Sequence, residues 1–214
     1  MNLTKSNLLN GTDCQKRLHY TLFKSNLAIW EKDPALEFLA KQGYDFEKIV
    51  CGLYPMALHQ PEYVYDGIYV RPDIVDGNEL IEVKSSTKVK EEQILDAAIQ
   101  YYVITGKEIE LKKCYIAVVN REYVLKGKLN PKKMVKIVDV TAEGLALMPE
   151  VEKLISSCRA TAKLKRAPSK TVGQHCFDCP FIETCSKELL KASVFDLRRG
   201  GKKSWELYDL GVKE

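Results

Sequence analysis

The feature that most constrains the fold is a predicted β-hairpin near the middle of the chain. Its sequence, over residues 71–86, is RPDIVDGNELIEVKSS. Two short stretches rich in apolar and β-branched residues flank the turn sequence DGN at 76–78, whose glycine can take the positive φ angle of a tight turn. Because alternate side chains of a strand point to opposite faces, we expect Glu82 and Lys84 on the same face.

The charged residues of this hairpin are compatible with a metal-dependent hydrolytic site. If the hairpin register brings Asp73 opposite Glu82 and Lys84, two carboxylates and one ammonium group converge. Two carboxylates bind a hard divalent cation through oxygen. A lysine beside that cation can position an attacking water and offset charge on a phosphate. An ordinary hairpin with surface charges is the alternative, because an acid two residues before a lysine is common.

Length and composition are those of an ordinary globular protein. The chain has 214 residues, which is long enough for one large domain or a domain with an appendage. Its residues are 45% hydrophobic and 29% charged, which is ordinary for a globular protein. No stretch approaches the ~18 apolar residues of a membrane span, and the first residues lack the apolar core of a signal peptide. We therefore expect a cytoplasmic protein without a membrane partner. The net charge of +4 permits nucleic-acid binding.

The order of the predicted elements indicates an α/β fold. The predicted helices cover residues 6–10, 15–24, 34–53, 88–105 and 141–164, and the predicted strands cover residues 71–75, 80–85, 114–119 and 134–140. We expect the sequence GTD at 11–13 to end the first helix, and Pro149 to break or kink the last one. The β-β-α-β order through the middle predicts a mixed sheet flanked by helices.

Two of these helices carry polar residues beside apolar stripes. The stripe of the helix over 34–53 consists of Leu36, Leu39, Phe46, Val50 and Leu53. Glu47 lies at the edge of this stripe, four residues after Gly43, where a glutamate usually faces solvent. Asp96 and Gln100 share one face of the helix over 88–105, and a solvated polar face is the ordinary interpretation.

A basic segment follows the last predicted helix. Residues 159–170, RATAKLKRAPSK, contain five basic side chains and no acidic one. A solvated linker and a contact with a phosphate backbone explain this segment equally well.

Cysteines form the second strong signal. Cys176, Cys179 and Cys185 follow the spacing C-x2-C-x5-C, which is typical of a metal or cluster site. His175 as the fourth ligand gives a Cys3His zinc site, whereas Cys14 gives the all-thiolate set that a [4Fe–4S] cluster usually takes. The residues alone do not decide between these two ligand sets. The remaining cysteines, Cys51, Cys114 and Cys158, lie in apolar or helical settings and are interpreted as structural.

Together these motifs resemble the iron–sulfur nucleases of the PD-(D/E)XK superfamily. Over residues 6–188 the similarity is to the RecB-like branch, which includes the CRISPR-associated exonucleases of the fourth Cas type and the AddB nuclease domain. Pro72-Asp73 with Glu82-Val83-Lys84 matches the superfamily core. Further motifs of the branch align with the pairs Gly43-x3-Glu47 and Asp96-x3-Gln100, with Glu47 at the place of a metal-binding histidine.

The resemblance implies a set of site residues. The implied ligands of Mg²⁺ or Mn²⁺ are the side chains of Glu47, Asp73 and Glu82 and the carbonyl of Val83. The implied catalytic residues are Asp73, Glu82, Lys84 and Gln100. The implied contacts to DNA are Lys88, Lys90, Tyr101, Lys163, Lys165 and Arg166. The implied ligands of a [4Fe–4S] cluster are Cys14, Cys176, Cys179 and Cys185, and Zn²⁺ is the alternative at these cysteines.

The implied architecture is a restriction-endonuclease-like mixed sheet flanked by helices, with the C-terminal cysteine region joined to the N-terminal helices. We expect a single nuclease domain with a helical part at 1–60, a catalytic core at 61–140 and an iron–sulfur part at 141–214. The segments LTKSNLLNGTDCQKRLHY and SVFDLRRGGKKSWELYDLG also resemble an uncharacterised bacterial family of RecB-like domains. In that family the module often precedes a second exonuclease-like domain. Because the sequence stops at Glu214, we expect this protein to be a stand-alone version of the module or a shorter relative.

The predicted function is hydrolysis of DNA by a metal-dependent nuclease, expected to act as an exonuclease on single-stranded or end-containing DNA. Other nucleases, helicases and CRISPR adaptation proteins are the partners that the resemblance suggests. CRISPR adaptation, repair, recombination and phage defence all stay open as pathways. Two other classes compete with the enzyme: a DNA-binding adaptor with a degenerate nuclease core, and a zinc-binding interaction module.

Overall fold

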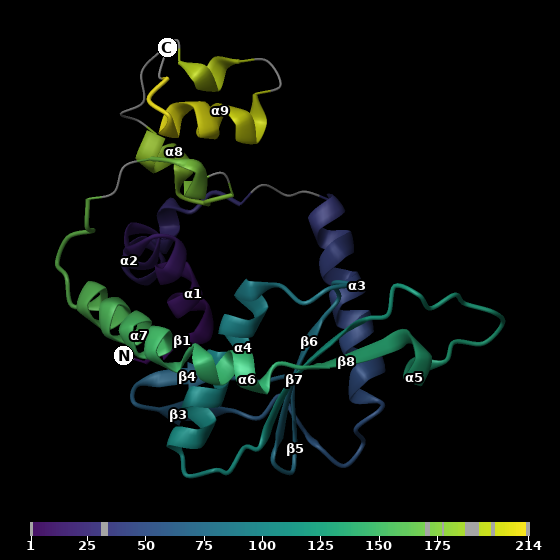
Figure 1. The fold of residues 1–214 in the computed structure, drawn as a ribbon. Helices are drawn as coiled ribbons and strands as arrows, with labels where there is room; N and C mark the ends of the chain where they lie inside the picture. The colour runs from purple at the N-terminus through teal and green to yellow at the C-terminus, as the bar shows by residue number, and fades with distance from the viewer. Residues whose placement is uncertain are drawn as a thin grey trace. The chain divides into compact units, whose positions relative to one another are not determined.

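The computed structural model describes residues 2–30, 34–169, 172–176, 178–186, 193–197 and 200–212, without the side chains of Gln174 and Asp196. Figure 1 shows the chain as a ribbon. It divides into two compact units. The first comprises Met1–Lys5 and Lys32–Ile155, and the second comprises Ser6–Glu31 and Ser156–Glu214. The second unit therefore combines the N-terminal helices with the C-terminal cysteine region, and the expected three-part division of a single nuclease domain stays a prediction.

The first unit is built on a mixed sheet in the order β2-β5-β6-β7-β8. Its strands are β2 (Leu58–His59), β5 (Ile74–Asp76), β6 (Glu79–Lys84), β7 (Lys113–Val119) and β8 (Val135–Asp139). β6 and β7 run parallel, and the other neighbouring pairs are antiparallel. The hairpin predicted around the turn at 76–78 is the β5–β6 pair, and the crossover from β6 to β7 contains a helix, as a parallel connection requires.

A second, smaller sheet lies in the same unit. Its order is β1-β4-β3, formed by β1 (Leu3–Thr4), β3 (Tyr63–Tyr65) and β4 (Ile68–Val70). β1 pairs in parallel with β4, with Leu3 opposite Ile68. This pairing fixes the position of Lys5, the residue that directly follows β1.

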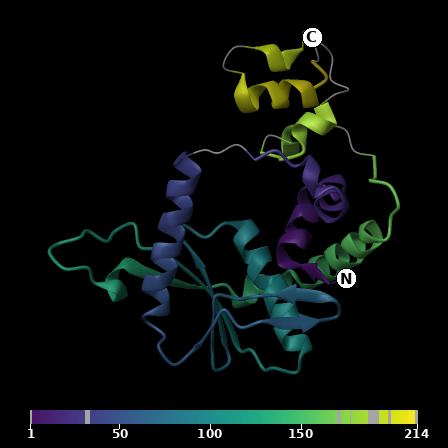
Figure 2. The same ribbon diagram turned by 180° about the vertical axis from the view of Figure 1, so that it is seen from behind.

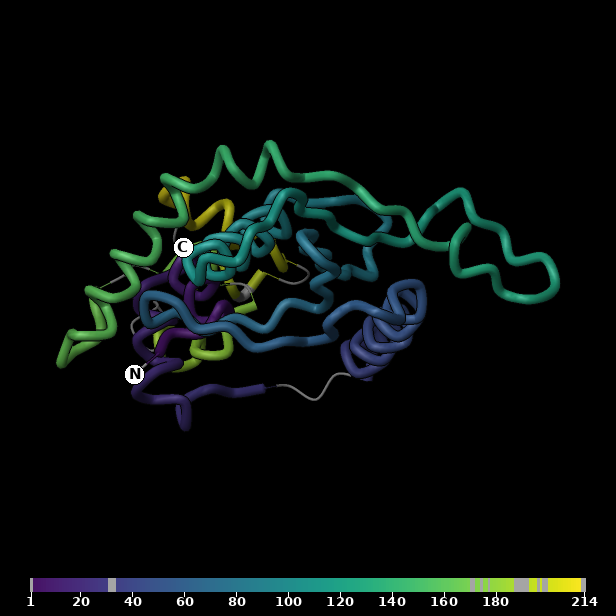
Figure 3. Tube along the Cα trace, turned by 90° about the horizontal axis from the view of Figure 1, so that it is seen from below, coloured from purple at the N-terminus to yellow at the C-terminus, as the bar shows by residue number. Residues whose placement is uncertain are grey.

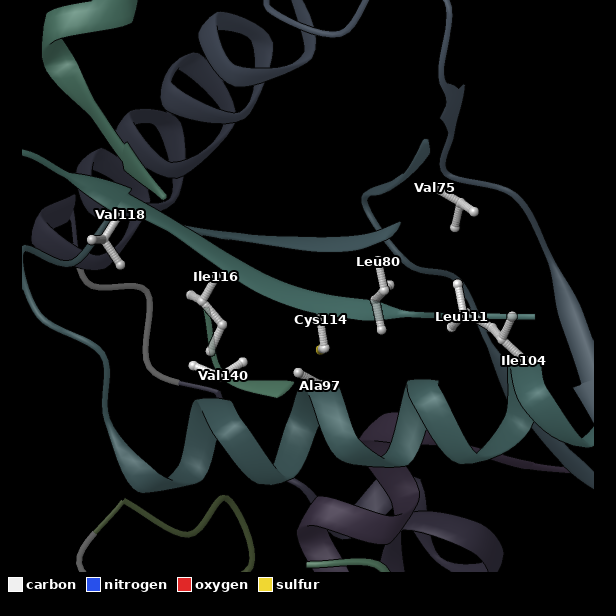
Figure 4. Close-up of a cluster of buried hydrophobic side chains, with 9 residues drawn as sticks. All are labelled: Val75, Leu80, Ala97, Ile104, Leu111, Cys114, Ile116, Val118 and Val140. Carbon is white, nitrogen blue, oxygen red and sulfur yellow. The ribbon is translucent and has the colours of Figure 1, made fainter. Parts of the chain in front are cut away.

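Helices cover both faces of the larger sheet. α3 (Pro34–Cys51) packs Phe46 and Val50 against one face, in a cluster that includes Ile81, and it runs alongside the strands in Figure 2. α4 (Glu91–Gly106) packs Ala97 and other residues against the opposite face, in the cluster that contains Leu80 and is drawn in Figure 4. Neighbouring residues of β6 thus point to opposite layers, and the predicted mixed sheet flanked by helices is confirmed.

The predicted stripe of α3 is only half buried. Leu36 is 60% exposed and Leu39 is 56% exposed, whereas Phe46 and Val50 are buried. The apolar stripe is therefore buried only in the second half of α3. The sequence period identifies the helix, but the extent of the sheet beneath it decides how much of the stripe is covered.

Two short helices and one longer helix complete the first unit and lead out of it. They are α5 (Pro131–Met134), α6 (Thr141–Ala146) and α7 (Met148–Ala162), and α7 continues into the second unit. The predicted break near Pro149 is confirmed, because α6 ends and α7 begins on either side of Leu147. None of the helices among the described residues is long and apolar enough to cross a membrane.

The first helix does not end where the sequence predicted. α1 (Lys5–Asp13) continues through Gly11, and the chain separates α1 from α2 (Gln15–Phe23) at Cys14, which has an extended backbone with φ −161° and ψ 118°. Gly11 is buried, and a Cβ at this position would collide with the Sγ of Cys158. Its lack of a side chain therefore serves close packing rather than helix termination.

The second unit brings together segments from both ends of the chain. Its further elements are η1 (Ser25–Leu27), η2 (Gln174–Cys176), α8 (Ile182–Cys185), η4 (Val194–Asp196) and α9 (Gly201–Asp209). The rings of Tyr20 and Phe181 meet edge to face with centroids 5.4 Å apart. The hydroxyl of Thr161 donates to Gln15 Oε1 at 2.6 Å. These contacts join α2 to the end of α7 and to the cysteine region.

Candidate active site

The alternation of β6 turns its charged residues toward α4. Leu80 of β6 packs in the cluster beneath α4, and Glu82 and Lys84 follow on the same side at intervals of two residues. Asp96 and Gln100 of α4 face them. Glu82 is 2% exposed and Gln100 is fully buried, so the ordinary interpretation of a solvated polar face on this helix is wrong.

Hydrogen bonds and ion pairs connect these four residues into one network. Lys84 Nζ lies 2.7 Å from Glu82 Oε1 and 2.7 Å from Asp96 Oδ2. Gln100 Nε2 donates to Glu82 Oε2 at 2.7 Å and to Asp96 Oδ1 at 3.1 Å. Every oxygen of the two buried carboxylates therefore has a partner, which offsets the cost of burying their charge.

A second lysine enters the network from the N-terminus. Lys5 Nζ lies 2.7 Å from Asp96 Oδ1 and 3.1 Å from Glu82 Oε1. Sequence reasoning missed both Lys5 and Asp96. The sequence does give an indication for Asp96, because it shares one helix face with Gln100 at a spacing of four residues. Lys5 had only its place inside the segment LTKSNLL, which belongs to the family resemblance.

These charges shift the pKa of the groups that carry them. Burial alone would raise the pKa of Asp96, but the ammonium groups of Lys5 and Lys84 outweigh it and lower this pKa. Burial alone would lower the pKa of Lys84, but Glu82 and Asp96 outweigh it and raise this pKa well above its ordinary value. The lysine is thereby held in its charged form.

Asp73 approaches the network from β5. Ile74 pairs with Ile81 in the hairpin, and continuing this antiparallel register by one residue sets Asp73 opposite Glu82. The backbone N–H of Val83 donates to Asp73 Oδ2 at 2.7 Å. The structure thus brings together Asp73 and Glu82 on one side of the hairpin.

The electrostatic surroundings of Asp73 are unfavourable for a carboxylate. Burial and then the negative charge of Glu82 raise its pKa to about 7, with Glu47 adding a smaller push in the same direction and the Val83 N–H acting against them. Glu47 lies on α3, half-buried, and accepts a hydrogen bond at 2.6 Å from Gln60 Nε2. Three carboxylates therefore act on the same small region of the first unit.

The donor chemistry of this region fits a divalent cation, although the ligands are not fully assembled. Within the described ranges, no group of three or more His, Cys, Asp or Glu side chains is arranged to hold a metal ion. Asp73 and Glu82 nevertheless supply two carboxylates, and a cation beside them would relieve the repulsion that raises the pKa of Asp73. Hard oxygen donors of this kind suit Mg²⁺ or Mn²⁺.

The predicted DNA contacts fall in three different environments. Lys88 and Lys90 are exposed in the connection from β6 to α4, and Lys90 pairs with Glu92 at 3.3 Å. Tyr101 packs against the core cluster beneath α4, and its hydroxyl donates to the carbonyl of Leu111 at 2.9 Å. Tyr101 therefore contributes to packing, and its role as a DNA contact stays a prediction.

The basic segment after α7 belongs to the second unit. Lys163, Lys165 and Arg166 are exposed. Lys170, the last basic residue of the predicted segment, lies outside the described residues.

The second unit contains a cysteine pocket. Its thiol-bearing residues are Cys14, Cys176, Cys179 and Cys185. The side chains of Tyr20, Phe181 and Arg17 also line it. Burial raises the pKa of Cys176 and the pKa of Cys179, and in both cases the neighbouring cysteines add to the effect. Cys114 and Cys158 are buried elsewhere, in keeping with their structural interpretation.

Comparisons with known proteins give no family. No family model matches the chain, and no curated protein matches it. One similar solved structure is a crystal structure of an alkaline exonuclease (LHK-Exo) from Laribacter hongkongensis, 12% identical, with a TM-score of 0.49, covering 74% of this chain and 88% of that one. Another is LHK-Exo in complex with dAMP, 15% identical, with a TM-score of 0.44 and the same coverage. At these scores, neither similarity assigns a function to the chain.

Proposed function

We propose that the protein is a metal-dependent nuclease that hydrolyses phosphodiester bonds of DNA. The observation that carries this proposal is the convergence of Asp73, Glu82 and Lys84 at the β5–β6 hairpin, with Asp73 surrounded by negative charge. Paired carboxylates beside a lysine suit a reaction in which a cation binds a phosphate and water attacks it. The resemblance of these residues to the PD-(D/E)XK nucleases supports the same chemistry.

Each residue has a defined task in this proposal. Asp73 and Glu82 would hold Mg²⁺ or Mn²⁺, with Glu47 and the Val83 carbonyl completing the ligand set. The bound cation would polarise the scissile phosphate and stabilise the leaving oxygen.

Lys84 orients the attacking water. Asp96 holds Lys84 in place through their ion pair. Gln100 holds Glu82 and Asp96 in place by donating a hydrogen bond to each carboxylate. Lys5 adds a second positive charge near the phosphate that is being attacked.

The cysteine pocket would hold a structural [4Fe–4S] cluster. Four thiols line one pocket, which suits a cluster that binds each thiolate through a different iron. His175 lines the same pocket, so a Cys3His zinc site, with sulfur at about 2.3 Å from the metal, is the alternative. The use of Cys14 as the fourth ligand distinguishes the proposed cluster from this zinc site.

The site also favours one alternative function. Glu82 is already bonded to Lys5, Lys84 and Gln100, so a metal ion has to compete with Lys5 for this carboxylate. A protein in which Lys5 permanently replaces the metal would bind DNA without cutting it. This is the degenerate adaptor, and binding without cleavage in the presence of metal distinguishes it from the enzyme.

Cleavage of labelled DNA tests the proposal. Linear and circular substrates, single-stranded and double-stranded, are incubated with Mg²⁺ or Mn²⁺. We expect cleavage of linear single strands, and its loss in Asp73→Ala and in Glu82→Ala while DNA binding persists, because phosphate contacts supply most non-specific affinity. Glu143→Ala, which removes an exposed carboxylate of α6, is the matched control and keeps full activity. Undiminished cleavage by Asp73→Ala, freed of contaminating nuclease, contradicts the site.

A further inference from the structure

An arm projects from the first unit between β7 and β8. The arm comprises residues 120–134 and ends with α5, and Figure 3 shows it extending beyond the sheet. Asn120 closes its base, because its N–H donates to the Met134 carbonyl at 2.7 Å and its side-chain amide donates to the Lys133 carbonyl at 2.9 Å. Farther out, the N–H of Asn130 donates to the hydroxyl of Tyr123 at 2.9 Å. These bonds hold the arm in a defined shape.

A basic cleft of about 720 Å³ lies between this arm and the residues that follow β6. The basic residues that line the cleft are Lys88, Arg121, Lys132, Lys133 and Lys136, and Glu122 is the acidic one. All five basic side chains are exposed. None of them forms an ion pair with a described residue, whereas Lys90 and Lys113 of the same unit do. The cleft therefore carries positive charge that the described protein does not neutralise.

The cleft begins next to the candidate active site. β6 and β7 run parallel in a register that sets Lys84 opposite Val118, so both strands end at the same edge of the sheet. The N–H of Val119 donates to the carbonyl of Ser86 at 2.9 Å just beyond this point. Thr87 is the first residue that lines the cleft after β6, only three positions beyond Lys84. The same strand thus carries the candidate catalytic residues and leads into the basic surface.

We propose that this cleft binds the sugar–phosphate backbone of the polynucleotide strand that enters or leaves the active site. Exposed cations that outnumber the acidic residues around them bind a polyanion by releasing its counterions, without reading its bases. An acidic protein would also be attracted, but the position of the cleft at the end of β6 favours the substrate itself. The identity of the bound polymer as substrate rests on the proposed nuclease function, whereas the binding does not require cleavage.

Binding is measured without metal, so that no cleavage takes place. A fluorescein-labelled oligothymidylate is titrated with the full-length protein in EDTA, and anisotropy gives Kd at several salt concentrations. We expect the triple variant Lys132→Gln/Lys133→Gln/Lys136→Gln to raise Kd by about tenfold or more at moderate salt. The slope of log K against log salt should fall by about 2, since each lost contact to a single strand contributes roughly 0.7.

The matched control removes the same charge elsewhere in the same unit. Lys107, Lys112 and Lys153 are exposed and do not line the cleft, so Lys107→Gln/Lys112→Gln/Lys153→Gln should leave Kd within about twofold of the wild type. Equal losses in the two triple variants contradict the proposal, as does equally tight binding of polyglutamate, which would make the cleft a docking surface for acidic proteins.

Failure of the cleft and failure of the nuclease remain distinguishable. Asp73→Ala keeps the cleft intact, so it should bind the oligothymidylate like the wild type whether or not cleavage exists. If Asp73→Ala still cleaves while the cleft variant has lost binding, the proposed active site is wrong and the cleft stands. If the cleft variant binds normally while Asp73→Ala no longer cleaves, the cleft is wrong and the nuclease stands. Repeating the titration with duplex DNA and with RNA identifies the preferred polymer.

Discussion

The carboxyl group of Asp73 is more easily protonated in the folded protein than in the unfolded chain. Burial and the charge of Glu82 raise its pKa from the ordinary value of 3.8 to about 7. Between these two values the folded protein binds more protons than the unfolded chain. The contribution of Asp73 to stability is therefore greatest at acidic pH, and it is lost as the pH rises toward 7.

This linkage predicts a pH-dependent stability in the absence of metal. Between about pH 5 and pH 8, the free energy of unfolding should fall by roughly 1–3 kcal/mol more for the wild type than for Asp73→Asn. Asparagine carries no charge but can still accept the hydrogen bond from Val83. Denaturant titrations in EDTA at each pH provide the measurement, and Mg²⁺ should restore stability to the wild type at the higher pH. Parallel pH curves for the two proteins contradict the shift.

The residues of the candidate site differ in how far the sequence predicts them. Asp73, Glu82 and Lys84 were predicted because the register of a short hairpin is set locally by its turn and its alternation. Lys5 was not predicted, because it lies 77 positions from Glu82 in the sequence. It reaches Glu82 only because β1 pairs with β4. Asp96 was misplaced because a polar residue on a helix normally faces water. In the structure Asp96 is buried and forms ion pairs with Lys5 and Lys84.

At the scale of elements, local sequence patterns predict whether a segment is a helix or a strand better than they predict where the segment ends. The hairpin, the crossover helix and the two following strands were all predicted, since their periods and turn residues are local. The end of α1 was not, because Gly11 was interpreted as a helix breaker. Its actual role is a close approach to Cys158, which no local pattern reveals.

The packing at Gly11 gives a prediction at this scale. Gly11→Ala should lower the free energy of unfolding by about 1–3 kcal/mol, because the new methyl group overpacks against Cys158. The double variant Gly11→Ala/Cys158→Ala should recover much of this loss, since the second change removes the colliding sulfur. Thermal and denaturant unfolding of the four proteins of this cycle supply the coupling energy.

A glycine with open surroundings is the control. Apart from its chain neighbours and the backbone of its own helix, Gly144 of α6 has no atom within 4 Å of an added Cβ. Gly144→Ala should therefore be neutral or stabilise by up to about 1 kcal/mol, as alanine favours a helix. If both alanines destabilise equally, or if Cys158→Ala brings no recovery, close approach is not the reason for Gly11.

At the scale of the whole molecule, the second unit joins residues from the two ends of the chain. Contacts such as Tyr20 with Phe181, and the hydrogen bond from the Ile29 N–H to the Pro180 carbonyl at 2.8 Å, connect these segments. The sequence predicted this joining through Cys14 and the C-terminal cysteines. It did not predict the division into two units, because the division depends on which distant segments pack together rather than on any boundary signal.

A cluster bound in this unit would act as a staple rather than as a catalyst. Cys14 and Cys176 are separated by most of the chain, and a cross-link over such a loop removes conformational entropy from the unfolded state worth up to roughly 5 kcal/mol, a scale borrowed from disulfides. That figure is comparable with the net stability of a domain. Loss of one cluster ligand should therefore destabilise the fold.

The corresponding experiment separates colour, stability and cleavage. Protein purified without oxygen should be brown, and Cys14→Ala should bleach the colour and lower the Tm, with activity falling as the fold is lost. His175→Ala should keep the colour, because all four ligands of the proposed cluster are thiolates, and Cys51→Ala should keep it as a matched cysteine control. Lys84→Ala should keep the colour and lose cleavage, and its Tm should fall because the buried carboxylates of Glu82 and Asp96 lose an ion-pair partner. A colourless wild type that holds one zinc and is indifferent to the loss of Cys14 would overturn the staple and favour the His175 zinc site.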